Sequence, residues 1–270
     1  MKISIVTISY NQGRFLERAI QSIIGQHYDD IEYIVVDSGS TDGSRSLLSN
    51  YRDQISQLIL ESDSGPADGL NKGFTRATGQ IFGFVNSDDK LLPGALRYVN
   101  NFFNENHEVD VLMGSGVMMD ENDKTLRHIV PSRITKYAFA YGAIEFIQQS
   151  LFFRAEKYRE IGGFNINNRV SWDGELLLDF ILANAHFARS SAELGAFRVY
   201  SDSITGMKDY IKKHDVEHSR LFNKAIGRNA TSGDALVSSM LKAYKWISDP
   251  WYVTIRLMRK MVFAYVGSNS

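Results

Sequence analysis

The 270-residue chain contains no cysteine, only four prolines and almost no net charge. Without cysteine it can form no disulfide, no thiolate nucleophile and no zinc–thiolate site, which agrees with a reducing compartment. The formal net charge of −1 argues against a protein that binds nucleic acid over a broad surface. No uncharged apolar run reaches the roughly 18 residues that a membrane-spanning helix needs.

The first residues, MKISIVTISYNQ, also lack the pattern of a cleavable signal peptide. Their apolar run is short, and polar residues follow it at once. We therefore expect a cytoplasmic protein. Its length suits one large α/β domain or a domain with an appendage, and is enough to bury about three quarters of the surface of the unfolded chain.

Strand-like and helix-like segments alternate between residues 3 and 89. Apolar runs typical of buried strands cover residues 3–8, 31–36, 58–60 and 81–85, and the last of these opens the segment IFGFVNSDD. The segments between them have helical spacing; residues 66–77, for example, read as a helix with Pro66 in its first turn. This alternation predicts a mostly parallel sheet with helices on both faces.

Polar residues follow each of these apolar runs, namely Asn11, Asp37, Glu61, Asp63, Asp88 and Asp89. Each one alone could be a turn or cap residue. Ligands of open α/β sheets bind at the carboxyl ends of the strands, so carboxylates after three successive strands favour a binding site at one rim. Two adjacent carboxylates repel each other unless a cation intervenes, and oxygen ligands suit Mg²⁺ or Mn²⁺.

Two common phosphate-binding motifs are absent from these loops. SYNQGR stands where a dinucleotide-binding domain has GxGxxG, and no GxxxxGK[ST] motif occurs in the chain. A metal is therefore the better candidate for holding phosphates.

Six segments resemble, in order and at suitable distances, the motifs of family 2 glycosyltransferases: TISYNQ, VDSGSTDGS, ESDSGPADGLNKGF, ATGQIFGFVNSDD, QQSLFFR and IGGFN. The resemblance covers roughly residues 3–200. It implies the GT-A (nucleotide-diphospho-sugar transferase) fold, an α/β fold whose mostly parallel central sheet is flanked by helices. It also suggests a catalytic domain of residues 1–205, with a donor half (1–90) and an acceptor half (91–205), before a helical C-terminal extension (206–270).

The resemblance places a nucleotide-sugar in the first half. Thr7, Tyr10 and Asn11 would lie beside the base and ribose, and Asp37 would meet the edge of the nucleobase. A UDP-sugar is favoured because Asp37 can accept a hydrogen bond from a uracil N–H, although a guanine edge could donate one too.

The remaining donor residues follow from the same resemblance. Asp63, Asp68 and Asn71 would line the donor pocket, and Lys72 would lie near the phosphates. Asp88 would lie near the ribose, and Asp89 would hold Mn²⁺ or Mg²⁺ at the diphosphate. The usual DxD motif reads Ser87-Asp88-Asp89 here.

The acceptor side is expected around Gln148, Gln149 and Trp172. The segment Ser171–Glu175 precedes an apolar helix, and capping alone would explain carboxylates in its first turn. The resemblance places the catalytic base at Asp173, with Glu175 as the second choice. One base and one metal suffice for an inverting displacement, because the metal offsets the charge on the leaving diphosphate. A pair of catalytic carboxylates, as in a hydrolase, is not required.

One segment departs from the family pattern. Many relatives have a histidine before a Ser-x-Ser-like turn near the end of the catalytic region, whereas FRVYSDSIT offers Tyr200, Asp202 and Ser203.

The C-terminal segment predicts two further helices, over residues 236–247 and 251–266. Arg256, Arg259 and Lys260 share one face of the second helix. This basic stripe suits an anionic membrane surface. Packing against the catalytic domain or a second subunit explains it equally well, and both readings stay open.

The sequence thus predicts an inverting hexosyl- or N-acetylhexosaminyltransferase that moves a sugar from a nucleoside-diphosphate sugar to an acceptor hydroxyl. A lipid-linked or surface saccharide in bacterial polysaccharide biosynthesis is the expected acceptor. The protein would be cytoplasmic, with peripheral contact at the inner face of the plasma membrane as an option. A non-catalytic nucleotide-sugar-binding protein and a sugar nucleotidyltransferase are the alternatives, and homo-oligomerisation is undecided.

Overall fold

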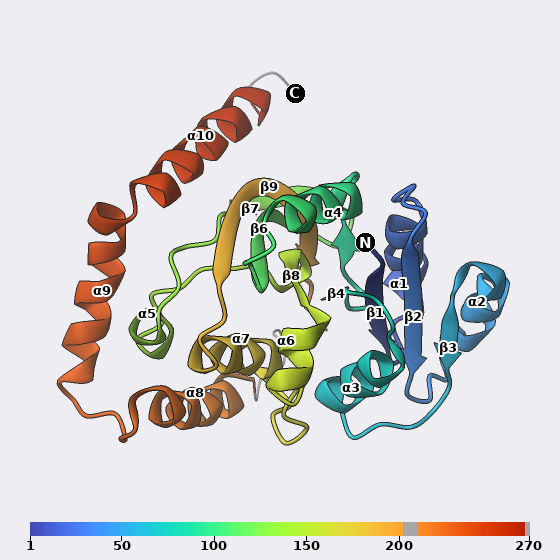
Figure 1. Ribbon diagram of the computed structural model, residues 1–270, viewed down its shortest axis with the longest axis horizontal. Helices are drawn as coiled ribbons and strands as arrows, with labels where there is room; N and C mark the ends of the chain where they lie inside the picture. Colours follow the sequence, from blue (N-terminus) through green and yellow to red (C-terminus); the bar gives the residue numbers. More distant parts are fainter. Residues whose placement is uncertain (202, 204–209, 268–270) are drawn as a thin grey trace.

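The computed structural model describes residues 1–201, 203 and 210–267 (Figure 1). Within these residues one nine-stranded sheet runs through the molecule in the order β3-β2-β1-β4-β8-β6-β9-β5, with β7 paired to β6. Helices cover both faces of this sheet, and three more helices follow it at the C-terminus.

The first half alternates strands and helices as the sequence predicts. Its elements are β1 (Ile3–Ser9), α1 (Gly13–Ile24), β2 (Ile31–Asp37), α2 (Ser44–Asn50), β3 (Gln57–Ile59), α3 (Pro66–Arg76) and β4 (Ile81–Phe84). β1 pairs in parallel with β2 and with β4, and β2 pairs in parallel with β3. The α/β fold class is therefore confirmed, and the carboxyl ends of these four strands lie at one edge.

The second half adds antiparallel pairs to this parallel core. Its elements are β5 (Lys90–Leu91), α4 (Ala95–Glu105), β6 (Val111–Met119), β7 (Thr125–Ile129), α5 (Lys136–Ala140), β8 (Leu151–Arg154), α6 (Ala155–Glu160), α7 (Trp172–Leu182) and β9 (Phe187–Arg198). β8 runs antiparallel to β4 and β6, whereas β9 runs parallel to β6.

Two parts of this half differ from the sequence expectation. β9 was not predicted, because its segment FARSSAELGAFR lacks a regular alternation of buried and exposed residues. The β-rich run expected from Ile147 begins instead with a 3₁₀ turn over Gln148–Ser150, and the strand starts at Leu151. The turn directs the two glutamine side chains toward the loop after β4, where they find hydrogen-bond partners.

The core has one apolar cluster on each face of the sheet. α1 and α4 bury residues such as Leu16, Ile20 and Phe103 against one face. α3, α6 and α7 cover the other face with an aromatic cluster. Gly73 permits the close approach of α3, since a Cβ there would lie 2.5 Å from Cγ1 of Val6. Burial of these side chains fixes α7 over the sheet.

The C-terminal helices are α8 (Tyr210–Ile226), α9 (Asp234–Ser248) and α10 (Pro250–Gly267). α8 packs against α5 and α7, and α9 and α10 continue along the same side of the molecule (Figure 1). Among the described residues, no helix has the length and apolar character to cross a membrane.

α10 packs on the earlier part of the chain through two of the three basic residues that the membrane reading used. Arg256 forms a 2.5 Å ion pair with Glu145, which also accepts a hydrogen bond from the buried Tyr252. Arg259 donates to the carbonyl oxygen of Ser191 at 2.7 Å. The structure therefore supports the packing alternative for both arginines, because their guanidinium groups are already engaged within the chain.

Candidate functional site

Asp89 lies inside the protein directly after β4. It is 1% exposed, its Oδ1 accepts a hydrogen bond from the backbone N–H of Arg198 at 2.8 Å, and its Oδ2 accepts from the side chains of Asn86 and Gln149. Burial raises the pKa of Asp89 well above its usual range, and the nearby charge of Asp88 adds to this effect. Both carboxylate oxygens are thus already used by the protein.

Asp88 is the more exposed of the two adjacent carboxylates. Its Oδ2 accepts a 2.9 Å hydrogen bond from the phenol of Tyr200. Burial raises the pKa of Asp88, and this hydrogen bond partly opposes the rise. Tyr200 occupies the segment where relatives carry a histidine, while Asp202 from the same segment lies outside the described residues.

Arg198 holds this loop in place, and the sequence analysis missed it. Its Nε donates to the carbonyl oxygen of Asp88 at 2.7 Å, and its backbone N–H binds Asp89. The guanidinium is buried, reaches Asp120 O at 2.8 Å and pairs with Asp123 at 2.6 Å. The only sequence signal was an arginine within the otherwise apolar stretch GAFRVY, where a buried cation requires partners.

Gln148 and Gln149, expected on the acceptor side, support the Asp88–Asp89 loop. Gln148 Nε2 donates to the carbonyl oxygen of Phe84 at 2.9 Å, and its Oε1 accepts from Asn86 and Gln149. Gln149 in turn donates to Asp89. Their contacts keep the turn after β4 in one conformation; contact with an acceptor stays a prediction.

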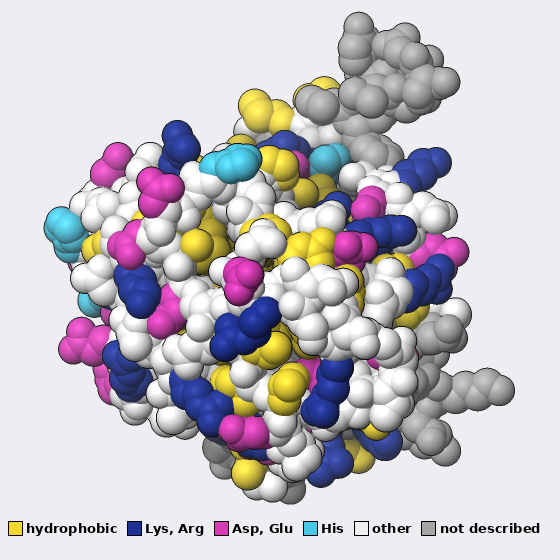
Figure 2. Space-filling view, turned by 90° about the vertical axis from the view of Figure 1, so that its right-hand side faces the viewer, with side chains coloured by type: hydrophobic (Ala, Val, Ile, Leu, Met, Phe, Trp, Pro, Cys, Tyr) yellow, Lys and Arg dark blue, Asp and Glu magenta, His cyan; other side chains and the backbone are white. Residues whose placement is uncertain are grey.

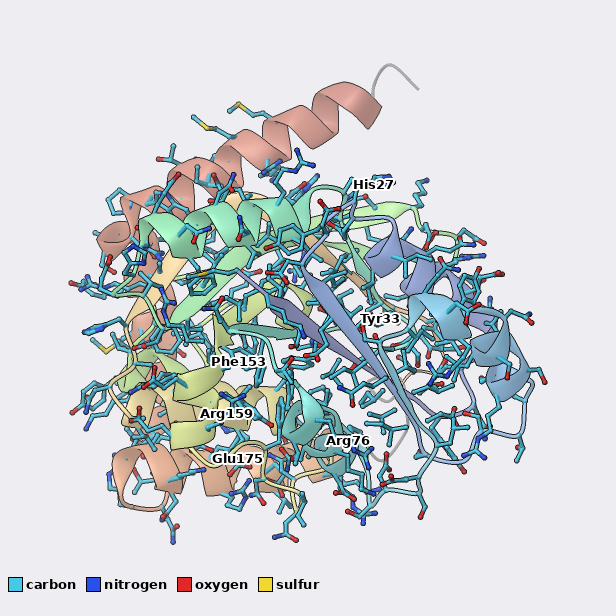
Figure 3. All side chains as sticks on the ribbon, turned by 45° about the vertical axis from the view of Figure 1, so that its right-hand side comes forward. His27, Tyr33, Arg76, Phe153, Arg159 and Glu175 are labelled. Carbon is cyan, nitrogen blue, oxygen red and sulfur yellow. The ribbon has the colours of Figure 1, made fainter. Side chains whose placement is uncertain are left out.

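The end of β1 carries the residues expected at the base and ribose. Thr7 is fully buried and accepts a hydrogen bond from the buried Tyr33 of the neighbouring strand β2, which Figure 3 labels. The side chain of Thr7 therefore faces the core, and its contact with a nucleoside stays a prediction. Tyr10 is 61% exposed at the rim. Ser9 Oγ is buried without a partner among the described residues, and the sequence analysis overlooked it.

Asn11 and Asp37 organise the neighbouring loop. Asn11 adopts a positive φ of 52°, and its side chain accepts from the backbone N–H of Thr41 at 2.8 Å. Asp37 is fully buried and accepts from Arg45 and from the backbone and hydroxyl of Ser40. Burial opposes ionisation, yet these donors lower the pKa of Asp37. The contact of Asp37 with a nucleobase stays a prediction.

The donor-pocket residues predicted on α3 line a cavity, and one of them also binds a neighbouring turn. Asp68 and Lys72 form a 3.5 Å ion pair; together with Asn71, Thr75 and Arg76 they line a cavity of about 260 Å³. The side chain of Asn71 also clamps the turn at Phe164, whose backbone N–H and carbonyl oxygen it binds at 2.9 and 2.8 Å.

Asp63 lies before α3, where its Oδ1 accepts from the backbone N–H of Gly65 at 3.0 Å. Burial raises the pKa of Asp63. The charge of Lys72 lowers this pKa and that of Asp68 raises it, so the three charged groups lie near one another.

α7 begins beside the end of β4. The ring of Trp172 packs 5.6 Å from that of Phe84 and 5.7 Å from that of Phe164, so Trp172, expected on the acceptor side, belongs largely to the core. The next residue, Asp173, is half-buried, and burial raises its pKa. A carboxylate with a raised pKa, held close to the carboxyl end of the sheet, suits a general base.

Glu175, the second choice for the base, is enclosed by four polar or charged side chains. It is 1% exposed, and it binds Arg220, Lys224, Asn165 and Asn168. Hydrogen bonds from these groups lower its pKa to about 2 against the opposing effect of burial. Such a carboxylate is a poor proton acceptor.

The described residues contain no cluster of three or more His, Asp or Glu side chains that could enclose a metal. Mg²⁺ and similar cations often use one or two carboxylates together with substrate phosphates, so a single accessible carboxylate is compatible with such an ion. By its exposure, Asp88 fits that role better than Asp89 does. The metal role of Asp89 stays a prediction, and Asp88 is the alternative that exposure favours.

Comparison with known proteins places this arrangement in a family. The family model described as glycosyl transferase family 2 matches residues 4–164. The chain belongs to this family. It is 36% identical over 129 residues to an uncharacterized glycosyltransferase of Nostoc sp., covering 47% of this chain and 40% of that protein. It is 38% identical over 91 residues to the putative teichuronic acid biosynthesis glycosyltransferase TuaG of Bacillus subtilis, covering 33% and 36%.

Solved structures of similar fold cover nearly the whole of this family 2 member. S. aureus TarS 1–349 in complex with UDP-GlcNAc has a TM-score of 0.67 and 18% identity, covering 92% of this chain and 73% of TarS 1–349. The mannosyltransferase PcManGT from Pyrobaculum calidifontis in complex with GDP-Man and Mn²⁺ has a TM-score of 0.64 and 18% identity, covering 98% and 75%. At this identity the likeness confirms the GT-A fold.

Proposed function

We propose that this family 2 member is an inverting glycosyltransferase that transfers a sugar from a nucleoside-diphosphate sugar to an acceptor hydroxyl. The observation that carries the proposal is the packing of Trp172 on Phe84. It brings Asp173 at the start of α7 beside the end of β4, where Asp88 lies. A base and a diphosphate-binding carboxylate on neighbouring elements are what direct displacement requires.

Asp173 takes the proton of the acceptor hydroxyl as that oxygen attacks the anomeric carbon. Burial raises the pKa of Asp173 toward neutral pH, and a general base works best when its pKa lies near the pH of the reaction. A divalent metal, Mn²⁺ or Mg²⁺, would offset the charge on the leaving diphosphate when bound, and Asp88 is the residue we assign to hold it. Attack from the face opposite the leaving group inverts the anomeric configuration.

The donor is proposed to be a UDP-sugar. Tyr10 and Asn11 at the rim would contact the nucleoside, and Asp63, Asp68 and Lys72 would act near the sugar and phosphates. Structural relatives in complex with UDP-GlcNAc and with GDP-Man and Mn²⁺ support a nucleotide-sugar and a divalent metal. The sequence relative TuaG, named for teichuronic acid biosynthesis, supports a role in saccharide assembly. The acceptor is proposed to be a lipid-linked or surface saccharide.

A peripheral position at the inner face of the membrane is proposed to depend on apolar residues, since Arg256 and Arg259 bind the catalytic domain. Large apolar side chains on α9 and α10 are exposed, among them Met240, Tyr244, Ile247, Leu257, Met258 and Met261. Such side chains on helices beside cationic groups suit the interface of a bilayer.

The function is tested by measuring nucleoside diphosphate release from UDP-, GDP- and TDP-sugars with and without Mn²⁺. Slow release without an acceptor, abolished in Asp173→Asn and in the absence of metal, would support the enzyme. Binding of one nucleotide without any turnover would favour the nucleotide-sugar-binding alternative. Release of pyrophosphate from a nucleoside triphosphate and a sugar phosphate would instead identify a nucleotidyltransferase.

A further inference from the structure

Four charged residues join α7 to α8, and one of them, Glu175, follows the proposed base by two residues. Arg220 binds both carboxylate oxygens of Glu175, with Nη1 2.9 Å from Oε1. Lys224 donates to the same Oε1 at 2.9 Å and pairs with Asp179 at 2.6 Å. Figure 3 labels Glu175 among the helices in the lower part of the molecule. Two cations from α8 therefore converge on carboxylates of α7.

The same carboxylate also fixes the loop that precedes α7. Asn168 donates to Glu175 Oε2 at 2.8 Å, and Asn165 donates to both oxygens at 3.1 and 3.2 Å. Asn168 Oδ1 in turn accepts from the backbone N–H of Ser171 at 2.9 Å. The contacts thus bind the loop, the first turn of α7 and α8 into one unit, and Asp173 projects from that first turn.

Stability alone is a weak explanation for this cluster. Replacing a buried ion pair by apolar residues of similar volume is often neutral or stabilising, because desolvating the charges costs as much as their attraction returns. Ion pairs and bidentate hydrogen bonds do, however, impose a particular geometry. The geometry imposed here is that of the turn that carries the proposed base.

We propose that Glu175, Arg220 and Lys224 are positioning residues that hold Asp173 in the orientation for proton abstraction. On this proposal α8 supports the active site by fixing the start of α7. It does so although it lies beyond residues 4–164 of the family match and beyond the predicted catalytic domain. The inference rests on the proposed role of Asp173 as base.

The test uses Arg220→Met, Arg220→Lys and a matched control, Arg228→Met. Arg228 also makes a bidentate ion pair, with Asp234 at 2.7 and 2.8 Å, but it lies in the loop after α8. It joins this loop to α9, and none of its hydrogen bonds within the described residues reaches α7. Each variant is assayed for kcat and KM with the UDP-sugar that the native chain uses. UDP binding is measured by thermal unfolding, and amide hydrogen exchange is followed over residues 172–176.

We expect Arg220→Met to lower kcat by roughly 10- to 100-fold, as small displacements of a catalytic group do. UDP binding should be unchanged, and exchange over residues 172–176 should accelerate. Arg220→Lys should recover part of kcat because it restores the charge without the bidentate geometry. Arg228→Met should match the native chain in kcat.

Equal kcat values for Arg220→Met and the native chain would overturn the inference, as would an equal loss in Arg228→Met. If no donor is turned over by the native chain, the exchange data alone decide whether α8 orders the start of α7. Faster exchange over residues 172–176 in Arg220→Met would then show that α8 orders the start of α7, even though the proposed function fails. Unchanged exchange would reject the coupling itself.

Discussion

The phenol of Tyr200 donates a 2.9 Å hydrogen bond to Oδ2 of Asp88. It connects the segment after β9 with the loop after β4, two parts of the chain that are 112 residues apart. The ring of Tyr200 packs 4.9 Å from that of Phe15, which keeps the phenol in place. A neutral donor thus orients the carboxylate to which we assign the metal.

Tyr200→Phe removes this donor and leaves the ring packing. Partners that orient a metal-binding carboxylate typically contribute 10- to 100-fold to metal affinity. We therefore expect the apparent affinity for Mn²⁺ in the presence of UDP to fall about tenfold. Titration of Mn²⁺ at fixed UDP measures it. Tyr252→Phe on α10, which removes a phenol–carboxylate hydrogen bond to Glu145, is the control and should leave the titration unchanged.

Asp88→Asn and Asp89→Asn separate the two adjacent carboxylates. At about 100 times its dissociation constant, UDP with Mn²⁺ should stabilise the native chain by roughly 2.7 kcal/mol. Asp88→Asn should lose the part of this shift that requires the metal. Asp89→Asn should lower the melting temperature without ligand, because its amide group meets N–H donors in a buried site. Retention of the metal effect in Asp88→Asn, with loss in Asp89→Asn, would reassign the metal to Asp89.

Asp173→Asn should reduce transfer by about 10²- to 10⁴-fold while UDP binding persists. The base must be deprotonated, and burial raises its pKa, so kcat should rise with pH and level off above that pKa. The midpoint of this rise is expected above the ordinary aspartate value of 3.8. A pH–rate profile of the native chain measures it. A flat profile down to pH 4 would argue against Asp173.

Glu175→Gln should destabilise the fold by about 1–3 kcal/mol at neutral pH. Arg220 and Lys224 lose a buried partner, but both are partly exposed and keep Glu217 and Asp179. The pKa of Glu175 is lowered from 4.5 to about 2. Its contribution to stability is therefore present above about pH 4.5 and is lost as the pH falls toward 2. Urea unfolding of both proteins from pH 7 to pH 2 checks this; their difference should shrink across that window.

Contact with a lipid surface is predicted to depend on apolar residues of α10. Met258→Glu combined with Met261→Glu should reduce sedimentation with anionic phosphatidylglycerol vesicles. Arg256→Glu would oppose the carboxylate of Glu145 and should act mainly on stability. Equal sedimentation of the native chain and the double variant would remove the membrane from the proposal.

The face of the molecule seen in Figure 2, over the first half, carries interspersed charges of both signs.

Local patterns determined much of this protein. The alternation of apolar runs and helical spacing gave β1–β4 and α1–α3, because each pattern follows from how a single strand or helix buries one side. The start of α7 near Asp173 was readable for the same reason. The rim positions of Tyr10, Asp63 and Asp88 followed from the rule that parallel strands end at one edge.

Only the tertiary structure decided which carboxylates are bound by other side chains and which stay accessible. Asp89 is taken up by Arg198, 109 residues away, and Glu175 by Arg220, 45 residues away. The same holds for Arg256, whose partner Glu145 lies 111 residues earlier. A charged side chain looks equally available in any sequence, and its role depends on the donors that the fold brings to it. Those donors come from β9, α8 and α10, whose positions no local pattern encodes.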